Sequence, residues 1–383
     1  MKILQILPSL EMGGVERGTV EVARALKSAG IENAVASSGG PMVAELEAIG
    51  VPHFQLPVQS KNPFTVWRNI GQIAELARRE KFTLLHVRSR APAWSVYYAS
   101  RRTGIPMLAT YHGVYGTSPA WLKIPYNRIM TKGIKVIAVS DHVKRHIIET
   151  YGVPESKIVR IHRGADINLF RPSAETSARA NALKTQLGFA ASLPVVTLPG
   201  RLTRWKGQTV LLQALQQMRN QTLGVLFVGS DQGRSEYTAE LKALAAKLPP
   251  SVQVVFLSRS DDMPAVYALS AVVANCSTDP EAFGRTIPEA QAMGIITVGT
   301  SHGGACETIR HGITGFLTPP GDAAALAHTL DYILELPETA AAAIRDASIA
   351  SVRENFSTEK MCAATLAIYR DLSCNSATRP TNE

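Results

Sequence analysis

Just past its midpoint the chain reads Val195-Val196-Thr197-Leu198-Pro199-Gly200-Arg201-Leu202-Thr203-Arg204-Trp205-Lys206-Gly207. The first four residues are β-branched or aliphatic and predict a buried strand, and the residues after Gly207 predict a helix. A strand, a loop and a helix form one βα unit of a parallel sheet. Arg201 and Lys206 are therefore expected beyond the carboxyl end of the strand, where α/β sheets bind ligands, and two cations there suit a diphosphate.

The rest of the chain repeats this unit. Short apolar runs alternate with helical patterns at residues 3–7, 34–37, 84–87, 107–110, 136–139 and 158–161, and again at 195–198, 224–228, 252–256, 271–274 and 296–298. The alternation pauses between Asp166 and about Leu193. The pattern predicts an α/β protein with two Rossmann-like, doubly wound parallel-sheet domains facing a cleft, residues 1–172 and 173–356. Residues 357–383 are expected to add a last helix that packs back on the first domain, and a polar, disordered tail from Asn375.

Composition narrows the class of protein. With 383 residues, 45% hydrophobic and 19% charged, the chain is long enough for two domains of average size. No apolar run approaches the roughly 20 residues that span a bilayer. The four cysteines, which form no C-x-x-C pair, indicate neither a disulfide framework nor a zinc site and suit a reducing cytosol.

The net charge of +9 is unevenly distributed. Residues 1–171 contain 23 Lys+Arg and 12 Asp+Glu, so the first domain is the basic one. A basic surface can serve nucleic acid, anionic lipid or an anionic substrate, or can simply be a solvated face, and charge alone does not choose among these.

Two glycine-containing loops can be compared with the common nucleotide-binding motifs. Gly13-Gly14 follow the first predicted strand and precede a helix, so their amides can face an anion at the helix N-terminus. The spacing of these glycines is not G-x-G-x-x-G, which disfavours a dehydrogenase. The loop at Gly200 lacks the Gly-Lys-Ser/Thr ending of a P-loop, which disfavours an ATPase.

The segment most informative about function reads Asp279-Pro280-Glu281-Ala282-Phe283-Gly284-Arg285-Thr286-Ile287-Pro288-Glu289-Ala290-Gln291-Ala292-Met293-Gly294. Gly284 lets a backbone turn approach a ligand, and the amides near Arg285 and Thr286 can open a helix beneath a phosphate. A carboxylate accepts hydrogen bonds from vicinal hydroxyls, so Glu281 can hold a sugar and Glu289 a ribose. Together these residues point to a nucleotide-sugar site.

The chain here resembles the retaining glycosyltransferases of family four, which have the GT-B fold and whose signature is Glu, seven residues, Glu. Glu281 and Glu289 have that spacing, and further matching motifs fall at Gly13-Gly14, His112, Arg201, Lys206 and Gly303-Gly304. Two places differ from the family pattern: Gly294 is followed by Ile295-Ile296-Thr297, and residues 162–166 replace an Asn-Gly-Val-Asp loop.

The resemblance implies a role for each matching residue. Glu289 would bind the nucleotide ribose, and Glu281 would contact the donor sugar near the reacting carbon. Arg201 and Lys206 would stabilise the diphosphate leaving group, and His112 would face the donor sugar from across the cleft. It further implies a nucleoside-diphosphate sugar of the UDP or GDP type as donor, no cofactor, no metal requirement, and front-face attack by the acceptor hydroxyl.

The acceptor is expected on the first domain, whose basic residues include Arg88, Arg90, Arg101 and Arg102. The stretch from Trp121 to Lys132 interleaves aromatic and aliphatic residues with cations, which suits an anionic membrane surface, although a plain surface helix fits it equally well. Since similar enzymes extend lipid-linked envelope glycans, we expect a glycan or lipid-linked acceptor of lipopolysaccharide or envelope polysaccharide synthesis. The expected location is cytoplasmic, with peripheral binding to the inner face of the membrane.

Two other function classes remain open from the residues alone. One is a GT-B-fold sugar-nucleotide epimerase or phosphorylase, which would need no acceptor or would carry a lysine for pyridoxal phosphate. The other is a non-catalytic, basic nucleic-acid-binding protein, although the basic segments contain no recognition motif for nucleic acid.

Overall fold

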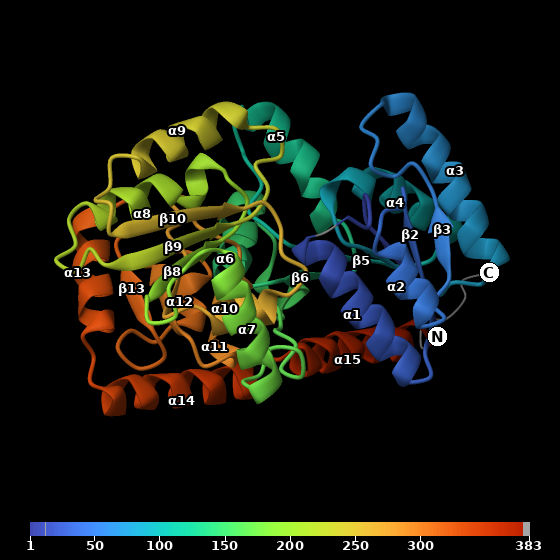
Figure 1. Ribbon diagram of the computed structural model, residues 1–383. Helices are drawn as coiled ribbons and strands as arrows, with labels where there is room; N and C mark the ends of the chain where they lie inside the picture. Colours follow the sequence, from blue (N-terminus) through green and yellow to red (C-terminus); the bar gives the residue numbers. More distant parts are fainter. Residues whose placement is uncertain (12, 378–383) are drawn as a thin grey trace. The chain divides into compact units, whose positions relative to one another are not determined.

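The computed structural model describes residues 1–11 and 13–377, with side chains to residue 372. The chain divides into two compact units: Met1–Arg163 joined by the C-terminal segment from Thr358, and Gly164–Ser357. Each unit contains one parallel sheet with helices on both sides (Figure 1). The predicted fold class, two doubly wound α/β domains, is confirmed for each unit taken by itself.

The first unit contains a seven-stranded parallel sheet in the order β3-β2-β1-β4-β5-β6-β7. Its strands are β1 (Lys2–Ile6), β2 (Glu32–Ser37), β3 (His53–Gln55), β4 (Leu84–Val87), β5 (Met107–Tyr111), β6 (Lys135–Ala138) and β7 (Ile158–Arg160). Its helices are α1 (Gly14–Ser28), α2 (Val43–Ala48), α3 (Pro63–Arg79), α4 (Arg90–Thr103), α5 (Ala120–Asn127), α6 (Asp141–Tyr151) and α15 (Thr358–Ala377), with short 3-10 turns η1 (Arg128–Thr131) and η2 (Glu155–Lys157).

The second unit contains a six-stranded parallel sheet in the order β10-β9-β8-β11-β12-β13. Its strands are β8 (Val195–Pro199), β9 (Leu223–Val228), β10 (Val252–Leu257), β11 (Val272–Ala274), β12 (Ile296–Thr300) and β13 (Phe316–Thr318). Its helices are α7 (Ala174–Gln186), α8 (Gln208–Leu215), α9 (Ser235–Ala245), α10 (Met263–Ala268), α11 (Thr286–Ala292), α12 (Ala305–Thr308), α13 (Ala323–Leu334) and α14 (Glu338–Asn355), with a 3-10 turn η3 (Arg204–Lys206).

Sequence features account for the element boundaries. The central strands β4, β5, β8 and β9 are buried along their whole length, and β1 is buried after Lys2, as expected for parallel strands covered by helices on both faces. Helix α3 begins after Asn62, whose side chain accepts a hydrogen bond from Phe64 N at 2.9 Å, with Pro63 in the first turn. Helices α4 and α6 end at Gly104 and Gly152, both in the left-handed conformation.

The boundary between the units lies earlier in the chain than the expected residue 172. Ala165 forms a bridge with Ser357, and its amide donates to Phe356 O at 2.8 Å, so residues 164–172 belong to the second unit. Phe170 packs against Tyr267 of the same unit with ring centroids 5.8 Å apart. The first sheet does not need this segment, because its last strand ends at Arg160.

The C-terminal helix α15 completes the core of the first unit. Its buried residues Met361, Cys362, Leu366 and Tyr369 join Ile3 and neighbouring strand residues in one apolar cluster. Since α15 reaches Ala377, residues 375–377 of the expected tail are helical, and the remainder of that tail lies outside the described residues. None of the described helices is both long and apolar enough to cross a bilayer.

Candidate active site

The crossover point of the second sheet brings two loops together. Strand β8 pairs with β9 on one side and with β11 on the other, so the loops that follow β8 and β11 leave the same edge in opposite directions. Such a point is where open α/β sheets form a ligand crevice. The two loops contact directly, because Thr278 N donates to Trp205 O at 2.7 Å.

Lys206 and Glu281 meet at this point. Lys206 Nζ lies 2.7 Å from Glu281 Oε1, and both side chains are largely buried, with 14% and 12% of their surface exposed. The same carboxylate oxygen accepts hydrogen bonds from Asn275 Nδ2 at 2.8 Å and Ser277 Oγ at 2.6 Å. A carboxylate held by three donors is fixed in position before any ligand arrives.

These contacts set the charge of Glu281. Burial by itself would raise the pKa of this carboxyl, but the ion pair with Lys206 and the hydrogen bonds from Ser277 and Asn275 outweigh burial and lower the pKa. Glu281 is therefore ionised at neutral pH.

The second glutamate of the motif is held by a separate set of contacts. Glu289 Oε2 accepts a hydrogen bond from Tyr267 Oη at 2.9 Å, and Glu289 Oε1 lies 3.3 Å from Arg285 Nε. Arg285 and Glu289 are one helical turn apart across the start of α11. The structure thus pairs each predicted glutamate with a cation, Glu281 with Lys206 and Glu289 with Arg285.

The turns around Glu281 need glycine for packing. Gly284 has φ +80° and faces the Glu281 carboxylate and Asn275. Gly303 has φ +59°, and a Cβ there would lie 2.6 Å from Glu281 O. Gly304 N donates to that same carbonyl oxygen at 2.8 Å. The Gly303-Gly304 turn therefore supports the backbone that carries Glu281.

Arg201 is placed differently from Lys206. Both belong to the loop after β8, but Arg201 is exposed and its Nη1 lies 3.4 Å from Gln232 Oε1. The structure therefore brings Lys206 to Glu281 and leaves Arg201 on the rim of the loop.

The first unit presents a histidine at the corresponding edge of its sheet. His112 directly follows β5, and neither of its ring nitrogens, which are inaccessible to solvent, has a hydrogen-bond partner among the described residues. Burial lowers the pKa of His112 well below its usual range, and the nearby Arg163, Arg88 and His86 lower it further. The imidazole is therefore neutral.

The predicted glycine pair lies at the start of α1. Gly13 is the N-cap residue of that helix, with no side-chain cap, and a Cβ there would collide with the Glu16 carboxylate. Gly14 O accepts a hydrogen bond from Arg163 Nη2. Gly18 also lies against the Arg163 guanidinium, so a guanidinium packs beside the first turn of α1.

A buried hydrogen-bond chain ends at Thr110, two residues before His112. His86 Nδ1 is 2.5 Å from Tyr369 Oη, and His86 Nε2 is 2.7 Å from Thr110 Oγ1. Burial first, and then Arg88, lowers the pKa of His86 well below its usual range. The chain joins α15 to the strand that ends beside His112.

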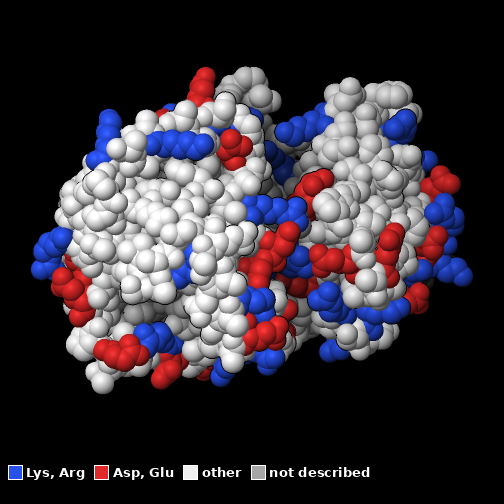
Figure 2. All heavy atoms as spheres, in the orientation of Figure 1, with Lys and Arg blue, Asp and Glu red and all other residues white. Residues whose placement is uncertain are grey.

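The basic residues expected to bind the acceptor do not lie together. Arg88 and Arg90 follow β4 at the carboxyl edge of the sheet, whereas Arg101 and Arg102 lie at the far end of α4. A 14-residue helix is roughly 20 Å long, so the two pairs lie at opposite edges. On the face seen in Figure 2, cationic and acidic side chains are intermixed over the first unit, shown on the right, rather than gathered in one basic patch.

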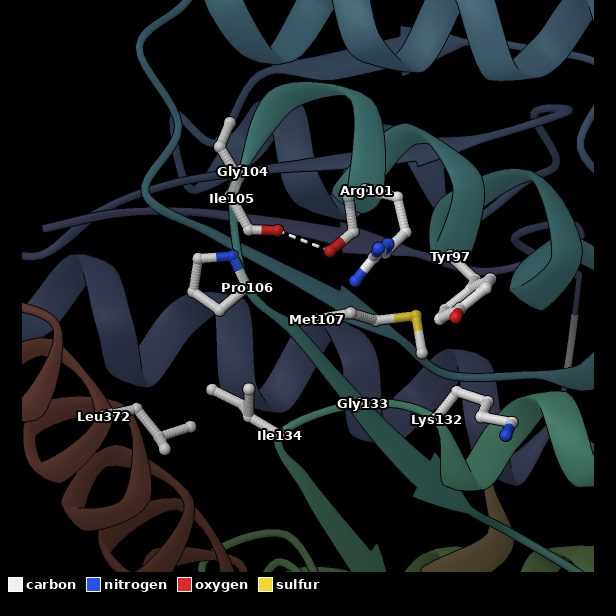
Figure 3. A pocket seen from close by; sticks show the side chains of 11 residues that line it. Tyr97, Arg101, Gly104, Ile105, Pro106, Met107, Lys132, Gly133, Ile134 and Leu372 are labelled. Atoms are coloured by element: carbon white, nitrogen blue, oxygen red, sulfur yellow. Dashed lines mark hydrogen bonds between the residues drawn. The ribbon is translucent and has the colours of Figure 1, made fainter. Parts of the chain in front are cut away.

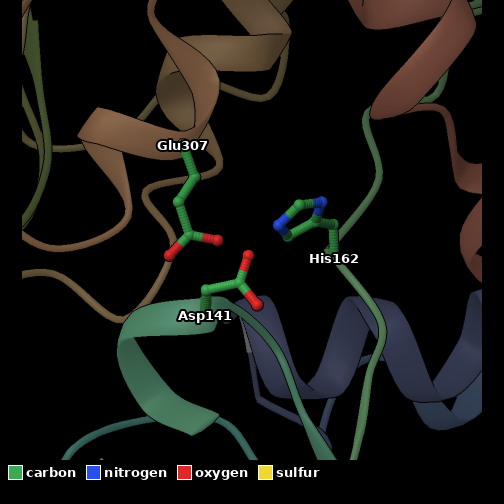
Figure 4. A group of neighbouring side chains, drawn as sticks. All are labelled: Asp141, His162 and Glu307. Carbon is green, nitrogen blue, oxygen red and sulfur yellow. The ribbon is translucent and has the colours of Figure 1, made fainter. Parts of the chain in front are cut away.

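Two side chains of the first unit that could bind a metal ion, Asp141 and His162, are already in contact with an arginine. Figure 4 draws Asp141 and His162 of the first unit and Glu307 of the second. Within the first unit, Arg160 Nε lies 3.1 Å from Asp141 Oδ1, and Arg160 Nη1 lies 2.8 Å from His162 Nδ1. A cation would have to displace this guanidinium, so we assign no metal site to these two residues.

Sequence reasoning missed the residues that hold the two glutamates: Asn275, Ser277 and Tyr267. Asn275 and Ser277 come directly after a predicted strand, which is a detectable signal for a polar residue at the ligand edge. Tyr267 gave no such signal, because it belongs to a short helix that meets Glu289 only through the tertiary fold.

Comparison with known proteins gives consistent matches over most of the chain. Residues 12–169 match Glycosyltransferase Family 4, and residues 180–348 match Glycosyl transferases group 1. A glycosyltransferase from Rickettsia africae has a crystal structure that is similar to this chain, with 39% identity, 97% of this chain and 98% of that chain covered, and a TM-score of 0.89.

Two further relatives carry information about ligands. Anabaena Alr3699/HepE, solved in complex with UDP and glucose, is 26% identical, covers 97% of this chain and 100% of its own, and has a TM-score of 0.84. A D-inositol 3-phosphate glycosyltransferase from Rhodococcus erythropolis is 29% identical over 329 residues, which are 80% of this chain and 72% of that protein. None of these matches supports an epimerase, a phosphorylase or a nucleic-acid-binding protein.

Proposed function

Because this chain belongs to glycosyltransferase family 4, a retaining family, and has the GT-B fold, we propose that it transfers a sugar from a UDP- or GDP-sugar to a glycan or lipid-linked acceptor. The observation that carries the proposal is the buried Lys206–Glu281 pair at the crossover point of the second sheet. A nucleotide-sugar donor presents a diphosphate and vicinal hydroxyls, which are the partners that an ammonium and a carboxylate bind.

The proposed reaction breaks the bond between the sugar's anomeric carbon and the diphosphate oxygen. The acceptor hydroxyl attacks the same face of the sugar, and its proton passes to the leaving phosphate oxygen, so the anomeric configuration is retained. Lys206 and Arg201 stabilise the negative charge that develops on the diphosphate. Because two side-chain cations take this role, we propose that the enzyme needs no metal ion.

The remaining predicted site residues complete the proposed donor site. Glu281 accepts hydrogen bonds from donor-sugar hydroxyls near the reacting carbon, and Glu289 from the ribose. The backbone at Gly284, Arg285 and Thr286, at the start of α11, approaches the phosphates, as does the Gly13-Gly14 turn. His112, neutral through burial, can both accept and donate a hydrogen bond to the sugar without adding charge.

The proposed acceptor belongs to lipopolysaccharide or envelope polysaccharide synthesis, at the inner face of the cytoplasmic membrane. Support comes from α5, where Trp121 is 79% exposed and Leu122 51% exposed beside the cation Lys123. An exposed indole next to an aliphatic side chain and a cation fits the interface of an anionic bilayer.

The donor site is tested by thermal unfolding without metal, in EDTA, with UDP, GDP, ADP, CMP and NAD. A nucleotide at 100 times its dissociation constant should stabilise the protein by about 2.7 kcal/mol. Glu289→Ala and Lys206→Ala should abolish the shift, whereas Lys247→Ala, an exposed lysine of the same unit, should keep it. If no nucleoside diphosphate shifts the folded wild type, the proposed donor site is wrong.

Transfer itself is tested with radiolabelled UDP-glucose and GDP-mannose and a membrane lipid extract as acceptor. The expected result is label in the lipid fraction in the presence of EDTA. Label released only as free sugar would contradict the lipid-linked acceptor, and activity restored only by added Mg²⁺ would contradict metal independence.

A further inference from the structure

A second pocket lies at the opposite edge of the first sheet from His112. It is lined by residues that directly precede β5 and β6, namely Gly104–Pro106 and Gly133–Ile134, together with Met107 itself. The amino ends of parallel strands share one edge, whereas His112 follows the carboxyl end of β5. The volume is about 520 Å³, within the range of small-molecule sites.

The pocket has a cationic end. Arg101 and Tyr97 project from α4, and Lys132 follows η1 (Figure 3). No carboxylate lines the pocket among the side chains that the structure describes, which end at residue 372. Neither Arg101 nor Lys132 forms an ion pair with a carboxylate of residues 1–11 or 13–377. Their positive charges are therefore not compensated by a carboxylate in the described part of the first unit.

Two other polar groups of the lining, the Ser100 hydroxyl and the Gly104 amide, are already engaged. Ser100 Oγ donates to Ile105 O at 2.5 Å, shown as the dashed line in Figure 3, and Gly104 N donates to Ser100 O at 2.9 Å. An incoming polar group therefore meets Arg101, Lys132 and the Tyr97 hydroxyl, all of which can donate hydrogen bonds.

The other end of the pocket is apolar. Pro106, Ile134 and Leu372 lie on the left in Figure 3, opposite Arg101 and Lys132. Leu372 comes from α15, so the C-terminal helix supplies one wall. Met107 is buried between the two ends, with 2% of its surface exposed.

From this arrangement we propose that the pocket binds a phosphate group attached to an apolar chain, as in an anionic phospholipid. Arg101 and Lys132 bind the phosphate oxygens, and the apolar chain lies against Ile134, Pro106 and Leu372. The charges decide the sign of the ligand, and the apolar wall distinguishes an amphiphile from free phosphate. The inference is independent of the proposed donor site, because none of these residues belongs to it.

The test is calorimetric titration of the full chain with monomeric dihexanoyl phosphatidylglycerol, dihexanoyl phosphatidylcholine and inorganic phosphate. We expect the phosphatidylglycerol to bind more tightly than either of the other two. The double variant Arg101→Gln/Lys132→Gln should weaken that binding by about tenfold or more, since it removes two charge-assisted contacts.

Two further variants separate specific from general effects. Arg102→Gln removes the same charge from the adjacent position of α4, outside the pocket lining, and should leave binding unchanged. Ile134→Ser should weaken binding of the lipid but not of phosphate. Unfolding temperatures of all variants show whether they remain folded.

Four results would overturn the inference. If the phosphatidylcholine binds as tightly as the phosphatidylglycerol, binding does not require a net negative charge on the ligand. If inorganic phosphate binds as tightly as the lipid, the apolar chain does not contribute to binding. If Arg102→Gln weakens binding as much as the double variant does, the pocket is not the binding site. The same follows if the folded wild type does not bind the lipid.

Discussion

The two sheets have the same strand order apart from the additional strand β7, yet the charged groups at their crossover points are arranged in opposite ways. In the second unit, cations and carboxylates meet in pairs: Lys206 with Glu281, and Arg285 with Glu289. In the first unit, the buried edge carries neutral histidines, and the buried Arg88 donates to the uncharged Gln5 Oε1 at 2.8 Å. One edge is built from ionised groups held in place, and the other keeps its imidazoles uncharged.

The comparison indicates that the two edges are suited to different parts of a ligand. Paired charges fix their partners in position and can exchange one partner for a ligand, which suits a charged donor. A neutral imidazole contributes hydrogen bonds without adding charge beside a positive reacting centre. Substitutions at the two edges test this contrast.

Removing the ammonium from the second unit should have the largest effect. Lys206→Ala is expected to lower kcat about 100-fold or more, because a preorganised cation at the leaving group is lost. The measurement is steady-state transfer with each nucleotide sugar, with Lys247→Ala as the control. An unchanged kcat would contradict the role of the Lys206–Glu281 pair in turnover.

Removing the negative charge of the second glutamate should weaken donor binding. Glu289→Gln keeps the shape of the side chain but loses a charge-assisted acceptor, so we expect nucleotide affinity to fall about tenfold. Titration calorimetry measures the change, and Glu354→Gln on the exposed face of α14 is the matched control. Equal losses in both variants would show that the effect is not specific to the site.

Breaking the hydrogen-bond chain of the first unit should lower stability. Tyr369→Phe leaves His86 Nδ1 buried without its partner, which is expected to cost about 1–3 kcal/mol of unfolding free energy. Denaturant unfolding measures this loss. Tyr332→Phe, at a half-exposed tyrosine of the second unit, should change stability little. If Tyr369→Phe leaves the free energy of unfolding unchanged, the hydrogen-bond chain does not stabilise the fold.

The pH dependence should show the smallest effect. The folded pKa of His86 lies well below its usual value of 6.5, so the unfolded state binds more protons as the pH falls below 6.5. Stability from this group is therefore present above pH 6.5 and is lost progressively on acidification. Unfolding measured between pH 5 and 8 should have a smaller slope in His86→Asn, and an unchanged slope would argue against a neutral buried His86.

The sequence predicted the fold well, for a simple reason. Fully buried parallel strands are continuous apolar runs, and 11 of these runs were identified. The two missed strands, β3 and β13, are three residues each and lie at sheet edges. An edge strand is covered on fewer sides, so its sequence is less constrained.

The site was predicted less completely. The residue types and spacing at Glu281 and Glu289 pointed to a nucleotide-sugar site, and family membership and transfer activity are confirmed. The sequence did not predict that Lys206 would bond to Glu281 while Arg201 lies with Gln232, because loop conformation depends on tertiary contacts. The individual roles of these residues, and of His112, stay predictions.

The helix α15 makes the first unit discontinuous in the chain. Its buried face packs on the strands of a sheet whose last strand is complete by Arg160. During translation all of Gly164–Ser357 is synthesised before that helix. Until the helix is synthesised, part of the apolar surface of the first unit is uncovered. The order of translation thus makes the second unit the earlier one to mature, and a chain interrupted near its end would leave the amino-terminal half exposed to aggregation.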